Sequence, residues 1–263
     1  MTTNEIRFDD GAAYERYMGV WSQLAGNTFL AWLAPAPGLR WLDVGCGNGA
    51  FTEMLIDQCA PASVHGVDPS EGQLVYARTR FASGVAQFFQ GDAMAQPFPN
   101  DMFDAAVMPL VIFFVPDAAK GVAEMARVVG PGGLVTAYAW DMHGGGFPYH
   151  ALQAEVRALG VPVPAPPSTG ASRMATMREL WAAAGLEAVE TREIEVQRTF
   201  ADFDDYWATI HGAPSLSTSI AAMSPEQFEL LKARMRVHLP ADESGRITCS
   251  ARANAIKGRV PRG

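Results

Sequence analysis

Short apolar segments alternate with segments of helical periodicity along the first 140 residues of the chain. The apolar segments predict strands at RWLDVG (40–45), SVHGVD (63–68), AQFFQGD (86–92), FDAAVMPL (103–110) and GLVTAYAW (133–140). Helices are predicted between them at AFTEMLIDQC (50–59), EGQLVYARTRF (71–81) and AAKGVAEMARVV (118–129). Asp117 is a suitable N-cap for the last helix, which the glycines and proline of 130–133 should end. This alternation predicts an α/β protein with an open, mostly parallel sheet and helices on both faces.

The pattern becomes less regular after Trp140. A helix is predicted at 174–186, a strand at 187–200, helical segments within 202–239 that break at 212–219, and a final strand at 251–260. The proline-rich stretch GVPVPAPPSTG (160–170) cannot form regular helix and favours an extended connection. We interpret the chain as a single domain, 1–263, with an N-terminal helical cover at 1–38, a core at 39–140, and helical lid insertions at 141–172 and 202–240.

Composition narrows the class of protein. The chain has 263 residues, is 49% hydrophobic and carries a formal net charge of −8, which fits a self-sufficient folded core. The negative charge repels phosphate backbones and argues against a nucleic-acid partner. Its 3 cysteines form no metal-binding pair, and the sequence contains neither a leader pattern nor a long apolar run. We therefore expect a cytoplasmic protein with no metal and no membrane partner, whose oligomeric state the sequence does not indicate.

Three glycines stand at alternate positions in the first strand-to-helix turn: Gly45, Gly47 and Gly49. In an open parallel sheet, ligands bind beyond the carboxyl ends of the strands, and this turn is the usual place. Glycine permits positive φ and a close approach of the backbone to a ligand, whereas three glycines that only turned the chain would lower stability. The G-x-G-x-G spacing differs from the G-x-G-x-x-G of dinucleotide-binding turns, so the neighbouring strand ends must identify the ligand.

Acidic residues follow the next two predicted strands. Asp68 could accept both hydroxyls of a ribose, or could cap the helix that begins near Ser70. Asp92 could meet the exocyclic amine of a purine, or could be a turn residue. Together with the glycine turn, these carboxylates indicate a nucleoside site. Because carboxylates repel a pyrophosphate and attract a cation, the site suits a positively charged nucleoside.

Four segments in order carry a resemblance to a known family: LDVGCGNGAF (42–51), VDPSEGQLVYAR (67–78), GDAMAQPFPNDMFDAAVMPLVIFFV (91–115) and EMARVVGPGGLVTAYAW (124–140). They resemble the motifs of class I S-adenosylmethionine (SAM)-dependent methyltransferases, particularly small-molecule enzymes related to the ubiquinone-type methyltransferases. The resemblance covers roughly residues 14–140, and only the general layout matches beyond it. It implies a Rossmann-like fold, SAM as cofactor, S-adenosylhomocysteine as product, and methyl transfer to a small-molecule acceptor by in-line displacement.

The resemblance also assigns roles to individual residues. The turn from Gly45 to Gly49 would cradle the amino-acid part of SAM, with Asp43 ordering the turn or meeting the ammonium. Asp68 would hold the ribose. Asp92 and the backbone amide of Ala93 would hold the adenine.

The remaining expected contacts come from other elements. Met108 would bring backbone toward the methionine part of SAM, while Gln73 stands where relatives often have an apolar residue against the adenine. Tyr17 and Trp21 could fold over the cofactor and shield its sulfonium, or could belong to an ordinary packing helix. The full expected cofactor set is Asp43, Gly45, Cys46, Gly47, Gly49, Asp68, Pro69, Gln73, Asp92, Ala93, Met108, Tyr17 and Trp21.

Methyl transfer from a sulfonium depends on alignment and on exclusion of water, and needs no dedicated nucleophile. A hydroxyl or thiol acceptor would still benefit from a general base. His143 and His150, which follow the fifth predicted strand, are the catalytic candidates. Each also fits a surface histidine or one held by structural hydrogen bonds.

Three other functions are compatible with part of the pattern. A noncatalytic SAM-binding module would share the same cofactor site, and so would a methyltransferase that acts on a macromolecule. An NAD-dependent oxidoreductase would also use Asp68 for a ribose, but the glycine spacing and Asp92 do not suit it. Binding of SAM rather than NADH separates this last function from the others.

Overall fold

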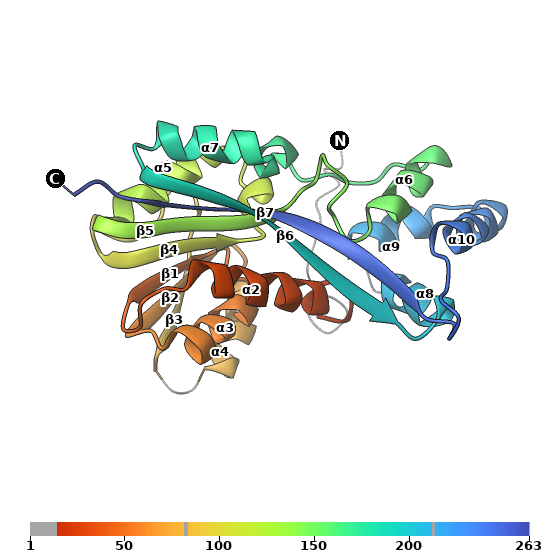
Figure 1. Ribbon diagram of the computed structural model, residues 1–263, viewed down its shortest axis with the longest axis horizontal. Helices are drawn as coiled ribbons and strands as arrows, with labels where there is room; N and C mark the ends of the chain where they lie inside the picture. The colour runs from red at the N-terminus through yellow and green to blue at the C-terminus, as the bar shows by residue number, and fades with distance from the viewer. Residues whose placement is uncertain (1–14, 82–83, 212–213, 263) are drawn as a thin grey trace. The chain divides into compact units, whose positions relative to one another are not determined.

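The computed structural model describes residues 15–81, 84–211 and 214–262, and the chain divides into two compact units (Figure 1). The larger, called here the sheet unit, comprises residues 25–144, 167–194 and 253–263. The smaller, called here the helical unit, comprises residues 1–24, 145–166 and 195–252. Residues 1–14 of the expected N-terminal cover lie outside the described residues.

The strands form a seven-stranded sheet in the order β3-β2-β1-β4-β5-β7-β6. Its strands are β1 (Arg40–Val44), β2 (Ser63–Asp68), β3 (Ala86–Gln90), β4 (Phe103–Pro109), β5 (Val129–Trp140), β6 (Glu187–Phe200) and β7 (Ile247–Arg259). The pairs among β1 to β5 are parallel, and β7 runs antiparallel to β5. The expected open, mostly parallel α/β sheet is therefore confirmed.

Helices cover both faces of the sheet unit (Figure 1). On one face lie α3 (Ala50–Cys59) and α4 (Glu71–Arg80), together with the part of α2 (Val20–Leu33) that belongs to this unit. On the other face lie α5 (Ala118–Val128) and α7 (Met174–Ala183). Phe29 of α2 packs on Tyr138 of β5 with ring centroids 4.5 Å apart, and Trp181 of α7 donates a hydrogen bond to the Val135 carbonyl at 3.0 Å. Both contacts fix a helix to the middle of the sheet.

The strands of the sheet interior are apolar because both faces are covered. Trp41, Leu42 and Val44 of β1 are fully buried, as is most of β4. Asp117 caps α5 as expected, since its side chain accepts a hydrogen bond from the Lys120 amide at 3.0 Å. The start of β5 differs from the prediction: Val129 already pairs with Phe103, and residues 130–133 form an irregularity inside the strand rather than a separate stop.

The helical unit contains α6 (His150–Ala158), α8 (Phe203–His211), α9 (Pro214–Ala221) and α10 (Pro225–His238). Glu155 of α6 accepts hydrogen bonds from Arg234 and His238 of α10, at 3.0 and 2.8 Å. The expected break at 212–219 is wrong for residues 214–219, which form most of α9 with Pro214 at its start. A short π-helix occurs at Glu15–Gly19, and short 3-10 helices occur at Ile112–Phe114 and Thr169–Ser172.

Candidate cofactor site

The carboxyl ends of four parallel strands meet at one edge of the sheet unit. Strand pairing aligns Val44 of β1 with Val67 of β2, and Asp68 of β2 with Gln90 of β3. On the other side of β1, Asp43 pairs with Val107 of β4. The glycine turn and the acidic residues predicted from the sequence are therefore gathered at this edge, where open α/β sheets bind their ligands.

The three glycines of the turn are required for two different reasons. Gly45, Gly47 and Gly49 all have positive φ, of 74°, 52° and 83°. A Cβ at Gly45 would lie 2.6 Å from a methyl of Val111, and one at Gly49 would lie 2.7 Å from the Phe81 ring. At Gly47 no described atom would lie within 4 Å of a Cβ. Packing explains the outer two glycines, whereas the middle one faces open space, as a ligand cradle requires.

Asp68 ties the glycine turn to the next strand-helix turn. One carboxylate oxygen, Oδ2, accepts a hydrogen bond from the Gly47 amide at 2.9 Å, and Oδ1 accepts one from the Ser70 amide at 2.8 Å. The N-cap of α4 is Ser70 and not Asp68, because the Ser70 hydroxyl accepts a hydrogen bond from the Gln73 amide at 3.5 Å. Burial raises the pKa of Asp68 above its ordinary value, and the two amides oppose that rise. A carboxylate has further lone pairs beyond these two bonds, so it can also accept ribose hydroxyls.

Asp43 is completely buried below the turn. Its Oδ2 accepts a hydrogen bond from the Thr52 hydroxyl of α3 at 2.6 Å. Oδ1 has no hydrogen-bond partner among the described residues. Burial raises the pKa of Asp43 to about 7; the Thr52 hydrogen bond lowers it, and the neighbouring Asp68 raises it further. The contact with Thr52, which the sequence analysis did not anticipate, shows that Asp43 links β1 to the helix after the turn.

These observations test whether the residues fit a cationic nucleoside. A buried carboxylate oxygen without a partner is costly, and an ammonium group nearby would relieve that cost. The open space beside Gly47 gives room for a ligand against the backbone. The carboxylate acceptors suit a positively charged ligand and disfavour phosphates, so the residues present fit SAM better than a dinucleotide.

Asp92 and Ala93 lie in the loop after β3. Asp92 is exposed, and its Oδ1 accepts a hydrogen bond from the Met94 amide at 2.8 Å. Arg127 of α5 holds the loop that follows by donating hydrogen bonds to the carbonyls of Gln96 and Phe98, at 3.1 and 2.9 Å. The role of Arg127 could not be predicted from local sequence pattern, because its contacts join segments about thirty positions apart.

The chain after β4 covers one side of the glycine turn. Met108 is fully buried. Leu110 has a positive φ of 58°, which is rare for a branched side chain, and its amide donates to the Tyr138 carbonyl at 2.7 Å. The next residue is Val111, whose methyls approach Gly45. No residue pattern predicts this strained bend, which places the chain after Met108 against the turn.

Three further members of the expected cofactor set belong to the same edge. Cys46 is buried, its sulfur lies against Gly66, and burial raises the pKa of its thiol. Pro69 is exposed, and its carbonyl accepts a hydrogen bond from Gln90 at 3.1 Å. Gln73 is half-buried at the start of α4. The buried thiol of Cys46 leaves only the backbone of that residue for ligand contact.

Tyr17 and Trp21 belong to the helical unit, where they form a cluster with Tyr149. The Tyr17 and Tyr149 rings are stacked with centroids 4.2 Å apart. The Trp21 indole donates to the Tyr149 hydroxyl at 3.2 Å, and that hydroxyl donates to the Tyr17 carbonyl at 2.8 Å. These contacts agree with the alternative interpretation, in which Tyr17 and Trp21 belong to an ordinary packing helix. A role for the two residues at the cofactor stays a prediction.

The two candidate bases fall in different units. His150 is exposed at the start of α6 in the helical unit. His143 belongs to the sheet unit, where its Nδ1 lies 3.0 Å from Arg173 and its Nε2 lies 3.2 Å from the Thr169 hydroxyl. Since a guanidinium can only donate, Nδ1 of His143 is the acceptor and Nε2 carries the hydrogen that Thr169 accepts. Both ring nitrogens of His143 are therefore engaged in this structure.

Comparison with known proteins agrees with this geometry. Residues 42–137 match the family described as "Methyltransferase domain". The ubiquinone/menaquinone biosynthesis C-methyltransferase of Paracoccus denitrificans is 37% identical over 111 residues, 41% of this chain and 44% of that protein. Phosphoethanolamine N-methyltransferase 2 of Haemonchus contortus, solved with S-adenosyl-L-methionine, has a TM-score of 0.59 at 18% identity, covering 99% of this chain and 61% of that one. The (4+2)-cyclase SpnF has a TM-score of 0.57 at 18% identity, covering 93% of this chain and 81% of that one.

The fold is a Rossmann-like α/β fold, and its acidic glycine turn is a candidate nucleoside site. Residues 42–137 form a domain that is similar to the methyltransferase domain family and to the ubiquinone/menaquinone C-methyltransferase of Paracoccus denitrificans. The match spans less than half the length of the Paracoccus relative. At identities under one fifth, the solved structures show likeness of fold alone.

Proposed function

We propose that this protein binds SAM at the edge of the sheet unit and transfers its methyl group to a small organic acceptor. The observation that carries the proposal is the joint presence of open space at Gly47, the buried carboxylate of Asp43 and the partly buried carboxylate of Asp68. The relatives support it, because they are named for methyl transfer to quinones and other small molecules.

The chain's own residues bind and orient in this proposal. Asp68 accepts the ribose hydroxyls while it holds the Gly47 amide, and Asp43 attracts the ammonium group with its unpartnered oxygen. Asp92 and the Ala93 amide contact the adenine, and the bend after Met108 closes the side of the turn. When bound, SAM supplies an activated methyl group on its sulfonium. Alignment of that methyl with the acceptor, in a site closed to water, supplies much of the acceleration.

Two features of the acceptor-binding region stay predictions from the sequence. They are the lid insertions at 141–172 and 202–240, and a general base at His143 or His150. The acceptor's attacking atom is not assigned. Cytoplasmic location and the lack of a nucleic-acid partner likewise stay predictions. Within the described ranges, no helix is long and apolar enough to cross a membrane.

Two measurements test the proposal. Calorimetric titration should show saturable binding of SAM and S-adenosylhomocysteine and no binding of NADH. Incubation with methyl-labelled SAM and pooled metabolites, followed by mass spectrometry, should place the label on a small molecule. NADH binding without SAM binding would reverse the cofactor assignment, and label found only on protein or nucleic acid would refute the small-molecule acceptor.

A second candidate function is a SAM-binding protein that does not transfer methyl groups. The similarity in fold to a (4+2)-cyclase supports this second candidate function, because one fold can carry several chemistries. The labelling experiment separates the two. Saturable SAM binding with no labelled product and no S-adenosylhomocysteine formed in the presence of the acceptor pool would favour the noncatalytic function.

A further inference from the structure

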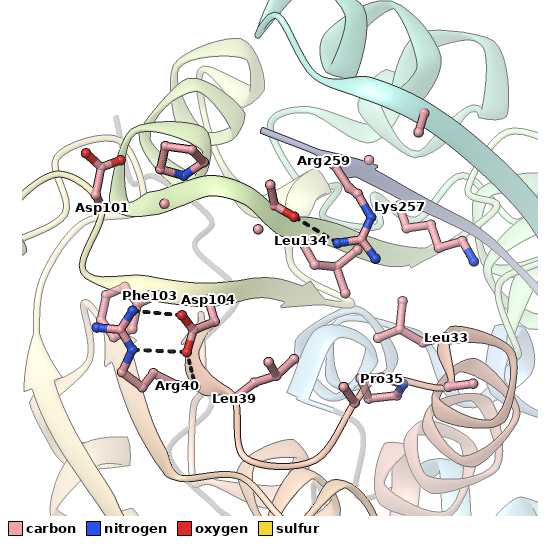
Figure 2. A pocket seen from close by; sticks show the side chains of 18 of the residues that line it. Leu33, Pro35, Leu39, Arg40, Asp101, Phe103, Asp104, Leu134, Lys257 and Arg259 are labelled. Atoms are coloured by element: carbon pink, nitrogen blue, oxygen red, sulfur yellow. Dashed lines mark hydrogen bonds and ion pairs between the residues drawn. The ribbon is translucent and has the colours of Figure 1, made fainter. Parts of the chain in front are cut away.

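A pocket of about 560 Å³ lies in the sheet unit at the edge opposite the glycine turn (Figure 2). We call it the amino-edge pocket, because its walls include Arg40 at the start of β1 and Phe103 at the start of β4. Its volume falls in the range of small-molecule sites, roughly 300–1,000 Å³. Residues 40 and 44 are the two ends of β1, so about 13 Å of strand separates this pocket from the candidate cofactor site.

Apolar side chains form part of the pocket wall. Leu33 ends α2, Leu39 precedes β1, and Leu134 lies in β5. Figure 2 shows Leu134 and Leu39 between the Arg40–Asp104 pair and Lys257. These side chains offer contacts for the aliphatic part of a ligand.

Two of the cationic groups around the pocket are already compensated. Arg40 makes a bidentate ion pair with Asp104, with Nη2–Oδ1 and Nε–Oδ2 distances of 2.7 and 3.0 Å. These hydrogen bonds hold the pKa of Asp104 below its ordinary value. Lys257 lies 3.2 Å from a Glu190 carboxylate oxygen and 4.8 Å above the Trp32 ring. Neither Arg40 nor Lys257 brings a free charge to a ligand.

Arg259 is different. It is exposed at the end of β7, and its Nη1 donates a 2.8 Å hydrogen bond to the Gly132 carbonyl, which is a neutral partner. Within the described residues, no carboxylate lies at ion-pair distance from this guanidinium. Arg262 reaches the same turn, since its Nε lies 3.0 Å from where a Cβ of residue 132 would be. The acidic Asp101 lies at the far end of the pocket from Arg259 (Figure 2). One end of the pocket therefore carries an excess of positive charge beside apolar walls.

We propose that the amino-edge pocket binds a small amphipathic organic anion, such as a medium-chain carboxylate. Arg259 holds the carboxylate, and the aliphatic part lies against Leu39 and Leu134. A guanidinium can bind a carboxylate through two parallel hydrogen bonds, and the contact with Gly132 orients it for this role. This site is separate from the cofactor site and does not depend on the proposed activity.

Calorimetric titration of the purified protein with octanoate measures the affinity of the pocket and tests the proposal. Octanoate should bind saturably to the wild-type protein, and 1-octanol, which lacks the charge, should bind at least about tenfold more weakly. Arg259→Gln should weaken octanoate binding by a similar factor, because the neutral amide cannot make the charged pair. Arg246→Gln is the matched control: Arg246 is exposed and lies in the helical unit, so its loss should leave octanoate affinity unchanged.

Thermal melting checks that each variant is folded. Both variants should fold like the wild type, because Arg259 and Arg246 are exposed. Addition of saturating SAM should leave octanoate binding unchanged, since about 13 Å of strand lies between the sites. Absence of saturable octanoate binding, equal affinity in Arg259→Gln and wild type, or displacement of octanoate by SAM would each overturn the proposal.

Discussion

The carboxylate of Asp68 accepts the backbone amide of Gly47 at 2.9 Å, across 21 positions of the chain. This bond joins the turn after β1 to the turn after β2. It gives one side chain two tasks, because Asp68 orders the glycine turn and is also the proposed ribose acceptor. Loss of the carboxylate should therefore affect both the shape of the turn and the affinity for a nucleoside.

The substitution Asp68→Ala should weaken SAM binding by about 1.5–3 kcal/mol, the usual contribution of a hydrogen bond to a charged group. Calorimetric titration measures the change. Asp57→Asn, at an exposed position of α3, removes one negative charge elsewhere and should leave the affinity unchanged. An Asp68→Ala protein that binds SAM as well as wild type would remove Asp68 from the site.

A methyl group at Gly47 should obstruct the ligand rather than the protein. Gly47→Ala and Gly38→Ala both place alanine at positive φ, 52° and 77°, with no described atom within 4 Å of the new Cβ. Each should lose about 1–2 kcal/mol of unfolding free energy from backbone strain. Only Gly47→Ala should also lose SAM affinity, by tenfold or more as an order of magnitude. Urea unfolding and calorimetry measure the two effects, and equal SAM affinity in the two variants would contradict the ligand cradle.

Protonation of Asp43 should make stability depend on pH. Its pKa is raised from 3.8 to about 7, so the folded protein retains a proton that the unfolded chain releases. The resulting stabilisation is complete below the unfolded pKa and is lost as pH rises through the folded pKa. Asp43→Asn cannot ionise and can still accept the Thr52 hydrogen bond, so its stability relative to wild type should increase between the two pKa values, from 3.8 to about 7, and level off above them. Urea midpoints across that range provide the check, and a pH-independent difference would show that folding does not raise the pKa of Asp43.

His65 should produce the opposite dependence. Its ring is stacked on Phe89 at 5.3 Å, and burial lowers its pKa below 6.5. The unfolded chain therefore takes up the proton first, so stability is complete above pH 6.5 and is lost as pH falls below it. His65→Phe keeps an aromatic ring but cannot be protonated, and its unfolding free energy should fall less than that of wild type on acidification. Parallel slopes for the two proteins below pH 6.5 would show that His65 titrates normally.

His143→Gln should leave methyl transfer within about threefold of wild type, because Arg173 and Thr169 occupy both ring nitrogens. Loss of a general base would instead lower the rate by about 10²–10⁴. The measurement is the initial rate with labelled SAM and the acceptor that the labelling experiment identifies. A fall of that size, together with loss of the acidic limb of the pH profile, would assign His143 as the base.

The sequence predicted the parts of this protein that depend on local pattern. Continuous apolar runs located β1 to β4, and the glycine spacing located the turn. Asp117 was identified as a cap because a capping side chain bonds to an amide only three residues ahead. These features are decided by neighbours along the chain.

Other parts depend on segments that meet only in the fold. The bond between Asp43 and Thr52, the approach of Val111 to Gly45 and the network around Arg127 each join different elements. The start of β5 differs from the prediction because Val129 already pairs with Phe103, and the pairing resumes at Leu134 after the irregularity at residues 130–133. A pattern of single residues contains no signal for such contacts.

The position of β7 between β5 and β6 has a consequence for synthesis on the ribosome. Both neighbours are translated before β7, so the free edge of β5 stays unpaired until residues 253–259 emerge. An unpaired strand edge is prone to pair with other chains. The nascent protein therefore passes through a stage at which chaperone protection and translation speed influence its yield, and slow translation between β6 and β7 prolongs that stage.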